Sequence, residues 1–328
     1  MSSDKILVTG ACGFIGSHLC EMLVGLGENV VAFDRYNRDN NWGWLEDSPF
    51  LDDMEIVLGD VRDYDSVVKA LNGCKAVFHL AALVGIPYSY ISPLAYLRTN
   101  IEGTYNVLES CRNLGIDQVI ITSTSETYGT AQYVPMDEQH PLVGQSPYSA
   151  SKIAADQLAV SYFRSFQLPI KIVRPFNTYG PRQSARAVIP TIIDQISADQ
   201  VDINLGNVEP TRDLTFVKDT CNGMVKIYES SKRFGEVTNI GMNSEISIAD
   251  LARTIGNLMG VKIKIVSDGE RQRPLNSEVE RLVCDNTKLI TEIGWEADYS
   301  LEKGLSETID WFRSAQSGTK HKKLLYRI

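Results

Sequence analysis

A short apolar run followed by three regularly spaced glycines constrains the fold of this chain more than any other feature. Residues 6–8 are apolar, and Gly10, Gly13 and Gly16 follow in the order G-x-x-G-x-x-G before apolar residues at helical spacing. This order predicts a strand, a tight turn and a helix. Free N–H groups at the start of such a helix attract an anion, and glycine lets the backbone approach a pyrophosphate closely.

Acidic residues at the ends of the next apolar runs indicate which dinucleotide binds there. Asp34 ends the run 29–33 and lies roughly 20 residues after the glycines, where a carboxylate accepts hydrogen bonds from an adenosine ribose and repels a 2′-phosphate. Arg35 follows directly and is able to tolerate a phosphate, so Asp34 favours NAD without excluding NADP. Asp60 ends a third run and is expected to meet the adenine amino group.

Strands and helices alternate through the first half of the chain. In order, strand-like runs lie at 55–61, 76–82, from Val119 and at 170–173, with helical patterns between them at Tyr64–Leu71, 100–114 and from Pro147 onward. They predict an α/β fold, a Rossmann-type doubly wound parallel sheet with right-handed crossovers. Ligands of such a sheet bind beyond the carboxyl ends of its strands. The segment 36–50 has no clean period and is predicted to be a loop or short irregular helices.

The second half of the chain has a less regular rhythm. We predict an NAD-binding Rossmann domain over residues 1–178, with a return segment near 214–240, and a smaller, interleaved C-terminal substrate-binding region over 179–328. The run 237–240 is expected to return to the large sheet. Arginines accumulate in the loops of the second region, and their guanidinium groups match phosphate oxygens.

Polar side chains suited to proton transfer follow the strand that begins at Val119. Thr124 and Glu126 are two positions apart, which keeps both side chains on one side while the backbone stays extended. Tyr148 and Lys152 are four positions apart on one face of the helix that begins near Pro147, so we expect the ammonium to lower the phenol pKa. A phenolate is then a general base or acid for a hydroxyl group. In contrast, His79 lies inside an apolar strand and is predicted to be a satisfied core residue.

Composition excludes several classes of partner. A net charge of -9 over 328 residues argues against a nucleic-acid or membrane-surface role, so a small-molecule partner is expected. Six cysteines form no C-x-x-C pair, and neither a disulfide framework nor a metal site is predicted. The first residues resemble no leader, and we expect a cytoplasmic location. The helix that carries Tyr148 is apolar over more than one face, which favours a homodimer built from it and the preceding helix.

Taken together, these residues resemble the extended short-chain dehydrogenase/reductase superfamily, specifically its NAD-dependent nucleotide-sugar epimerases and dehydratases. The resemblance covers nearly the whole length and rests on the three glycines, Asp34, Asp60-Val61, Leu80-Ala81-Ala82, Thr124, Tyr148-x-x-x-Lys152, residues 174–181, Arg212-Asp213, Arg273-Pro274 and Gly294-Trp295. It implies cofactor contacts at Gly10, Gly13, Phe14, Ile15, Gly16, Asp34, Asp60, Val61, Leu80, Ala81, Ala82, Tyr148, Lys152 and Pro175. It implies substrate contacts at Asn177, Arg186, Val188, Arg212 and Arg273.

The same resemblance implies a catalytic set of Thr124, Ser125, Glu126, Tyr148 and Lys152. In that family the tyrosine takes the proton of the sugar 4-hydroxyl while the nicotinamide takes the C4 hydride, and the threonine and lysine position or tune the step. Similar 4,6-dehydratases carry Thr-Asp-Glu, in which Glu removes the C5 proton and Asp helps to expel the C6 hydroxyl. Here Glu126 matches and Ser125 does not.

Segments 123–129, 184–190 and 276–281 look most like dehydratases that act on nucleotide-linked N-acetylglucosamine in the legionaminic acid pathway. We therefore expect a nucleotide-sugar 4,6-dehydratase acting on UDP- or GDP-linked N-acetylglucosamine. It would oxidise C4, eliminate water across C5 and C6, and return the hydride to C6. A 4-epimerase, a decarboxylase of a nucleotide-linked uronate, and a non-enzymatic NAD-binding sensor or scaffold on the same fold are the alternatives.

Overall fold

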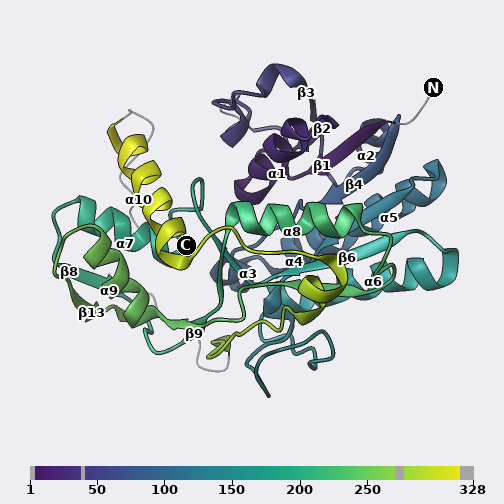
Figure 1. Ribbon diagram of the computed structural model, residues 1–328. Helices are drawn as coiled ribbons and strands as arrows, with labels where there is room; N and C mark the ends of the chain where they lie inside the picture. The colour runs from purple at the N-terminus through teal and green to yellow at the C-terminus, as the bar shows by residue number, and fades with distance from the viewer. Residues whose placement is uncertain (1–3, 38–40, 270–276, 318–328) are drawn as a thin grey trace.

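A seven-stranded parallel sheet forms the centre of the protein (Figure 1). Its strands are β1 (Lys5–Thr9), β2 (Asn29–Asp34), β3 (Met54–Leu58), β4 (Cys74–His79), β5 (Gln118–Thr122), β6 (Ile170–Pro175) and β11 (Val237–Ile240). In this computed structural model, which describes residues 4–37, 41–269 and 277–317, their order is β11-β6-β5-β4-β1-β2-β3. The order reverses between β1 and β4, where ligands of doubly wound sheets bind. The predicted fold class is confirmed.

Helices cover both faces of the sheet, and each face has its own apolar core. On one face α1 (Phe14–Gly25) packs beside α8 (Val217–Glu229), and on the other lie α2 (Tyr64–Leu71), α5 (Gly103–Leu114) and α6 (Pro147–Phe166). Successive residues of a strand point to opposite faces, so Ile6 and Val8 of β1 belong to the first core and Leu7 to the second.

The run 237–240 forms β11, which joins the large sheet beside β6. Val237 lies opposite Ile172, and Ile240 lies opposite Pro175. The chain therefore leaves the large sheet after β6 and comes back to it later, as expected for an interleaved arrangement. The boundary near residue 178 stays a prediction.

The helix α3 (Ile86–Ile91) packs against α6, and most of the remaining elements form a smaller lobe at the left of Figure 1 and the connections to it. The elements are β7 (Asn177–Tyr179), α7 (Val188–Ser197), β8 (Asp202–Leu205), β9 (Thr211–Arg212), β10 (Leu214–Phe216), β12 (Ile246–Ser247), α9 (Ile248–Leu258), β13 (Lys264–Ser267) and α10 (Leu301–Ser317). Three two-stranded sheets pair β10 with β7, β12 with β9, and β13 with β8. The short strands explain why the sequence has no regular rhythm here.

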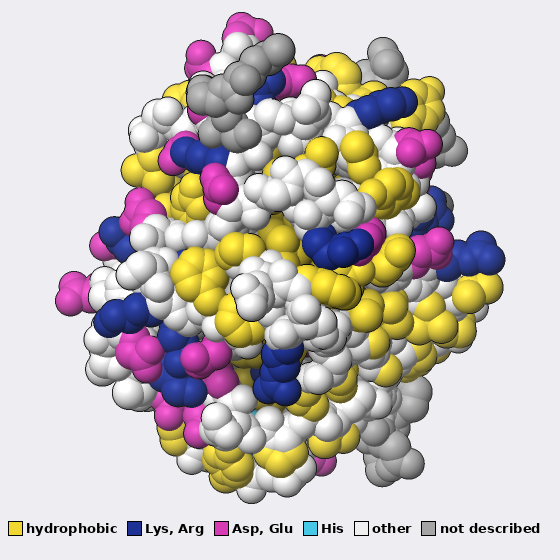
Figure 2. Space-filling model, turned by 90° about the vertical axis from the view of Figure 1, so that its right-hand side faces the viewer, with side chains coloured by type: hydrophobic (Ala, Val, Ile, Leu, Met, Phe, Trp, Pro, Cys, Tyr) yellow, Lys and Arg dark blue, Asp and Glu magenta, His cyan; other side chains and the backbone are white. Residues whose placement is uncertain are grey.

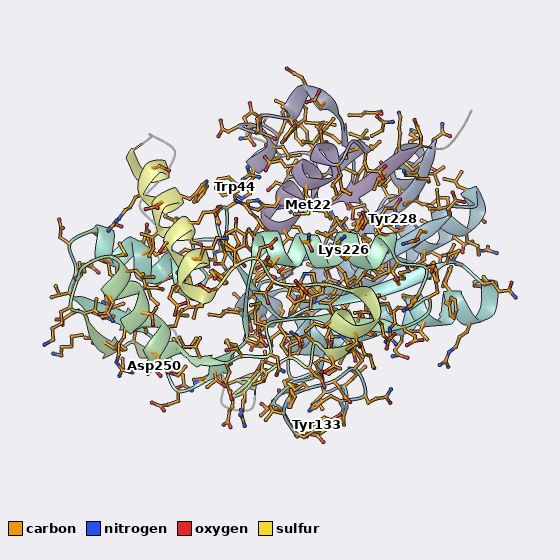
Figure 3. All side chains as sticks on the ribbon, in the orientation of Figure 1. Met22, Trp44, Tyr133, Lys226, Tyr228 and Asp250 are labelled. Atoms are coloured by element: carbon orange, nitrogen blue, oxygen red, sulfur yellow. The ribbon has the colours of Figure 1, made fainter. Side chains whose placement is uncertain are left out.

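Two segments differ from, or add to, the sequence-based expectations. The helix expected over 100–114 is part of a longer helical run, because α4 (Pro93–Tyr96) and a π-helical stretch η3 (Leu97–Glu102) lead directly into α5. The irregular segment 36–50 contains the 3-10 helix η1 (Gly43–Leu45). The Trp44 N–H donates to the Cys12 carbonyl at 3.1 Å, and its ring lies 5.4 Å from that of Trp311 in α10. Figure 3 shows Trp44 between α10 and α1.

In the described ranges, no helix is both long and apolar enough to cross a membrane.

Candidate active site

The turn after β1 is closed so tightly that two of its positions require glycine. Gly10 has a φ of +72°, and a Cβ placed there would lie 2.9 Å from the Ala81 nitrogen. A Cβ on Gly16 would lie 2.1 Å from the Gly10 carbonyl oxygen. Real Cβ atoms do not approach that closely, so the predicted roles of these glycines in turning and close packing agree with the geometry.

The same turn forms a cradle that fits a dinucleotide pyrophosphate. Gly13 precedes the first residue of α1, Phe14, and the first turn of the helix carries no acidic side chain to repel an anion. The chain after β4 passes directly beneath, because the Ala81 N–H donates to Thr9 Oγ1 at 3.1 Å. Backbone N–H groups, missing side chains and a helix N-terminus thus meet at the carboxyl edge of the sheet, beside β1 and β4.

Asp34 ties the end of β2 to this turn. Its Oδ2 accepts a hydrogen bond from the Cys12 N–H at 2.7 Å, and its Oδ1 accepts one from the Arg35 N–H at 2.7 Å. The carboxylate is therefore held in place next to the glycines, where the prediction expects a ribose. Asp60 is paired with Arg62 at 2.5 Å, and this hydrogen bond lowers the pKa of the Asp60 carboxyl.

The backbone after β5 does not stay extended as predicted. Thr124 caps the short 3-10 helix η4 (Ser125–Thr127), and its Oγ1 accepts a hydrogen bond from the Glu126 N–H at 3.3 Å. The expectation of an extended chain is wrong because this cap turns the backbone. Thr124 nevertheless hydrogen-bonds the Tyr148 phenol, and the charge of Glu126 acts on the same phenol. Ser125 between them is buried, with 2% of its surface exposed.

Tyr148 and Lys152 lie on the buried face of α6. The helix begins with a capping box in which Ser146 Oγ accepts from the Ser149 N–H at 3.1 Å, which confirms the predicted helix start. The Lys152 ammonium donates to the Thr122 carbonyl of β5 at 2.7 Å.

The expected lowering of the phenol pKa by Lys152 is wrong for this arrangement. Burial raises the pKa of Tyr148 well above its ordinary value, and the hydrogen bond with Thr124 offsets only part of that rise. The charge of Glu126 raises it further. Burial also lowers the pKa of Lys152, whose ammonium is directed to the main chain of β5.

His79 is a core residue, as its apolar surroundings predicted. The Thr104 hydroxyl donates to the Asn100 carbonyl at 2.6 Å and therefore accepts from His79, which leaves Nδ1 of the neutral ring to accept from Thr9 Oγ1 at 2.8 Å. Nε2 then carries the ring hydrogen and donates to Thr104 Oγ1 at 3.1 Å. Burial lowers the pKa of His79 to about 3, so the ring is neutral near pH 7.

The residues expected to contact substrate lie beyond the carboxyl end of β6 and in the smaller lobe. Asn177 begins β7, and its buried Oδ1 has no hydrogen-bond partner among the residues that the structure describes. Arg212 lies in β9, where its Nη2 is 3.3 Å from Glu278 Oε1. Val188 begins α7 and lies two residues after the exposed Arg186. Arg273 falls outside the described residues.

The charge of Arg186 acts on Tyr96, an aromatic neighbour of Tyr148. This charge lowers the pKa of Tyr96, although burial of that phenol dominates and raises its pKa to about 12. The rings of Tyr96 and Tyr148 are 6.2 Å apart, and Ile86 packs into the same cluster. The structure therefore packs η4, with Glu126 and its cap Thr124, against the helix of Tyr148 and Lys152, whereas Arg212 is engaged by Glu278.

Sequence reasoning missed three polar residues around Lys152, namely Ser123, Asp156 and Arg174. Asp156 and Arg174 form an ion pair at 2.7 Å with 2% exposure on each side chain. The signal for Asp156 was present in the sequence, because it continues the four-residue spacing of Tyr148 and Lys152 on the same helical face. The contact with Arg174 was not visible, because that residue comes from a different element.

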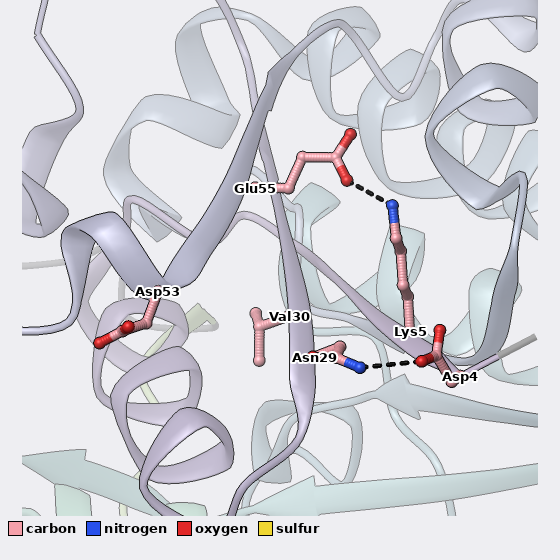
Figure 4. A pocket seen from close by; sticks show the side chains of 6 residues that line it. All are labelled: Asp4, Lys5, Asn29, Val30, Asp53 and Glu55. Carbon is pink, nitrogen blue, oxygen red and sulfur yellow. Dashed lines mark hydrogen bonds and ion pairs between the residues drawn. The ribbon is translucent and has the colours of Figure 1, made fainter.

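Two further features bear on where the site lies. A hollow of about 300 Å³ lined by Asp4, Lys5, Asn29, Val30, Asp53 and Glu55 occurs at the amino ends of β1 and β2, at the opposite edge of the sheet from the glycine turn (Figure 4). It is thus separate from the candidate site. In the part of the chain that the structure describes, no group of three or more His, Cys, Asp or Glu side chains is arranged to hold a metal ion.

Comparison with known proteins gives matches over almost the whole chain. A family model described as GDP-mannose 4,6 dehydratase matches residues 7–308. The dTDP-glucose 4,6-dehydratase of Streptomyces antibioticus is 31% identical, over 94% of this chain and 92% of that protein. The UDP-N-acetylglucosamine 4-epimerase of Methanobrevibacter ruminantium M1, solved with UDP-N-acetylmuramic acid, is 30% identical, with a TM-score of 0.86 over 96% of this chain and 100% of that one. The UDP-glucuronic acid 4-epimerase of Bacillus cereus, solved with UDP-glucuronic acid and NAD, is 30% identical, with a TM-score of 0.85 over 95% and 99%.

Proposed function

This chain belongs to the NAD-dependent nucleotide-sugar epimerase/dehydratase family of extended short-chain dehydrogenases/reductases, and within it we propose that the protein is a 4,6-dehydratase. NAD is the cofactor, as in relatives of the family solved with it. The proposed reaction converts an NDP-N-acetylglucosamine to the NDP-4-keto-6-deoxy sugar and releases one water. Both UDP- and GDP-linked substrates are candidates.

One observation carries the choice of a dehydratase. Glu126 lies in η4, which packs against the helix that carries Tyr148, and its charge acts on the buried phenol, so a second proton-transfer group is placed near Tyr148. Oxidation at C4 needs one base for the hydroxyl proton. A base for the neighbouring C5–H is needed only if the chemistry proceeds beyond C4, and Glu126 supplies it.

Each residue has a defined task in this proposal. The glycine turn, the start of α1 and Asp34 hold the dinucleotide, which when bound accepts the C4 hydride and returns it to C6. Tyr148 accepts the proton of the 4-hydroxyl once positive charge from Lys152 and the bound dinucleotide has lowered the pKa that burial raises, while Thr124 orients the phenol. Lys152 supplies positive charge behind it.

Elimination then uses the neighbouring pair of residues. The 4-ketone acidifies C5–H, and Glu126 takes that proton and delivers it to the C6 hydroxyl, which leaves as water. When the hydride returns to C6, Glu126, protonated again from solvent, supplies the proton that C5 needs. Ser125 replaces the aspartic acid of similar dehydratases and hydrogen-bonds the leaving oxygen, directly or through a water. Burial of Ser125 suits a hydrogen-bonding role, because a hydroxyl there is shielded from solvent.

Mass spectrometry of nucleotide sugars incubated with the protein and NAD tests the reaction. UDP- or GDP-N-acetylglucosamine should yield a product lighter by one water, and Tyr148→Phe should slow its formation by roughly 10²–10⁴-fold. An unchanged mass with inverted C4 would identify an epimerase. Release of carbon dioxide from a nucleotide-linked uronate would identify a decarboxylase, and no turnover with any nucleotide sugar would favour a sensor or scaffold.

Exchange with deuterated water tests the role of Glu126. The change Glu126→Gln should stop deuterium incorporation at C5 while C4 oxidation, followed by absorbance of the reduced cofactor, continues. The matched control is Glu138→Gln, a carboxylate that pairs with Lys288 at 2.8 Å and does not act on Tyr148 in the described structure. Retained exchange in the Glu126 variant would remove this residue from the mechanism.

We also propose that two copies of the chain associate through α5 and α6. Tyr105 on α5 and Phe166 on α6 are exposed at 45% and 50%, and Leu94 and Leu97 extend the apolar surface along the helical run that leads into α5. Figure 2 looks onto the side of the molecule where these helices lie in Figure 1 and shows hydrophobic side chains exposed between charged ones. Light scattering should give twice the monomer mass, and Tyr105→Glu should reduce it. A monomer in the unmodified protein would contradict the proposal.

A further inference from the structure

A buried ion pair lies directly behind the catalytic lysine. Asp156 is one helical turn after Lys152 on α6, and Arg174 reaches it from β6 with 2.7 Å between Nη2 and Oδ2. Each side chain of the pair is only 2% exposed. Burying two charges is expensive, and their replacement by apolar residues is often neutral or stabilising. Stability alone therefore gives little reason for this pair.

The carboxylate of Asp156 is fixed from one side only. Its Oδ2 accepts from Arg174 and from Ser123 Oγ, the latter at 2.6 Å, and Arg174 Nε donates to the same hydroxyl at 3.3 Å. Its Oδ1 is buried and has no hydrogen-bond partner among the described residues. A negative charge is thus held rigidly, with one oxygen uncommitted, in the interior next to Lys152.

Arg174 is itself held from the opposite side. Its guanidinium lies 4.5 Å from the ring centre of Tyr128, and the Tyr128 hydroxyl donates to Asn239 Oδ1 at 2.8 Å. Asn239 Nδ2 in turn donates to the Met136 carbonyl at 3.1 Å. The arginine cannot follow the carboxylate without breaking this packing, so the position of Asp156 is set by both α6 and β6.

Few charged groups act on Lys152. The titratable and charged groups around it are His79 on β4, Arg174 on β6, Glu126 in η4, and Tyr148 and Asp156 on its own helix. His79 is neutral near pH 7, and the Lys152 ammonium has the Thr122 carbonyl as its hydrogen-bond acceptor. Burial lowers the pKa of Lys152, and the charge of Asp156 raises it.

We propose that Asp156, fixed by Arg174 and Ser123, is a positioning residue that keeps the Lys152 ammonium charged and in place beside Tyr148. Its consequence for catalysis rests on the proposed function, whereas its effect on Lys152 does not. The arrangement resolves a conflict, because a lysine in a dry site tends to lose the proton on which its role depends. The carboxylate one turn away offsets part of the lost solvation.

NMR of the NAD-saturated protein carrying isotope-labelled lysine tests the proposal directly. The Lys152 signal is assigned by its loss in Lys152→Arg, and its chemical shift is followed with pH. Asp156→Asn should lower the pKa of Lys152 by about one unit or more, a tenfold or greater weakening of proton binding, and Asp156→Glu should restore most of it. An unchanged Lys152 titration in Asp156→Asn would overturn the proposal.

Two further variants keep the test decisive. Asp156→Asn combined with Arg174→Gln removes both buried charges, so it folds even if the single variant leaves an unpaired arginine. Its Lys152 pKa should still be lower than in the unmodified protein, because Asp156 is the charged group that acts on this lysine. Asp219→Asn removes another buried carboxylate, which accepts from the Asp298 and Tyr299 N–H groups, and should leave the Lys152 titration unchanged.

The pH dependence of turnover shows whether Asp156 acts by its charge or only by supporting the structure. Loss of the negative charge should shift both limbs of the profile of Asp156→Asn to lower pH, because the pKa of Tyr148 and that of Lys152 both fall. A merely structural role would lower the rate at every pH without moving the limbs, and would count against the proposal. If no nucleotide sugar is turned over, the proposed function fails while the NMR titration still decides the role of Asp156.

Discussion

The glycine turn after β1 and the region around Asp213 hold their backbone by different means. In the turn, main chain packs against main chain because Gly10 and Gly16 have no Cβ. Around Asp213, a buried carboxylate accepts hydrogen bonds from the N–H groups of Met242, Ser244 and Cys284 at 2.8, 3.4 and 3.0 Å.

Ion pairs hold the residues next to Asp213 as well. Arg212 pairs with Glu278, and Arg281 pairs with Glu245, which also accepts from the Thr211 hydroxyl. The turn is specified within a few consecutive residues, whereas the second region joins three segments that are far apart in the chain. Added side-chain bulk should therefore disrupt the glycine turn, whereas the stability of the region around Asp213 should depend on pH.

The largest effect is expected at Gly16. In Gly16→Ala the added Cβ would meet the Gly10 carbonyl oxygen at 2.1 Å, so the turn has to open. We expect the free energy of unfolding to fall by about 3 kcal/mol and NAD binding to weaken strongly, since overpacking of a dense site costs that much and the cradle is distorted. Denaturant unfolding and calorimetric titration with NAD measure the two effects.

Gly25→Ala is the matched control in the same helix. No atom lies within 4 Å of a Cβ built on Gly25, and the residue is exposed. Alanine should therefore stabilise α1 by up to about 1 kcal/mol and leave NAD binding unchanged. Equal effects of the two substitutions would show that close backbone approach is not what the turn depends on.

A smaller, pH-dependent effect is expected at Asp213. Burial raises its pKa from 3.8 to about 6, although the backbone N–H groups oppose the rise. The folded protein then binds more protons at this site than the unfolded chain between about pH 4 and pH 6. Its contribution to stability is fully present below pH 4 and is lost as the pH rises through 6.

Comparison with Asp213→Asn isolates the pH-dependent contribution of this carboxyl to stability, because asparagine has nearly the same size and shape as aspartate and does not titrate. The difference in unfolding free energy between the two proteins should fall by on the order of 2 kcal/mol from pH 4 to pH 7. Chemical unfolding at a series of pH values measures it. Asp199→Asn, at a position with a φ of +58° between α7 and β8, provides a control in the same lobe. A difference that stays flat with pH would mean that burial does not perturb Asp213.

Features that are set by neighbouring residues can be predicted from the sequence, whereas contacts between distant segments cannot. The sheet, the glycine turn and the start of α6 follow from local patterns, and the structure confirms them. The turn at Thr124 was missed because its cap competes with an apolar run that favours an extended chain. The pKa of Tyr148 was misjudged because burial is a property of the whole fold, and the four-residue spacing of Tyr148 and Lys152 contains no information about it. Pairs such as Arg174 with Asp156 are equally invisible, because their partners come from different elements.

The smallest expected effect concerns the contact that joins the glycine turn to α10. The Trp44 N–H donates to the carbonyl of Cys12 in the glycine turn. The Trp44 ring packs edge to face against the ring of Trp311 in α10. A double-mutant cycle with Trp44→Leu and Trp311→Leu should give a coupling of about 0.5–1.5 kcal/mol, since aromatic pairs contribute that much beyond their buried area. Circular dichroism is the appropriate probe of unfolding, because the substitutions alter tryptophan fluorescence.

A second cycle shows whether this coupling is local. Trp44→Leu is combined with Tyr133→Leu. In Figure 3 Trp44 lies in the upper half of the view and Tyr133 at its bottom, and Tyr133 is 45% exposed. Their effects should add within about 0.5 kcal/mol, because distant sites without shared partners are independent. If the Trp44 and Trp311 effects also add, the aromatic contact does not connect the cofactor turn to α10.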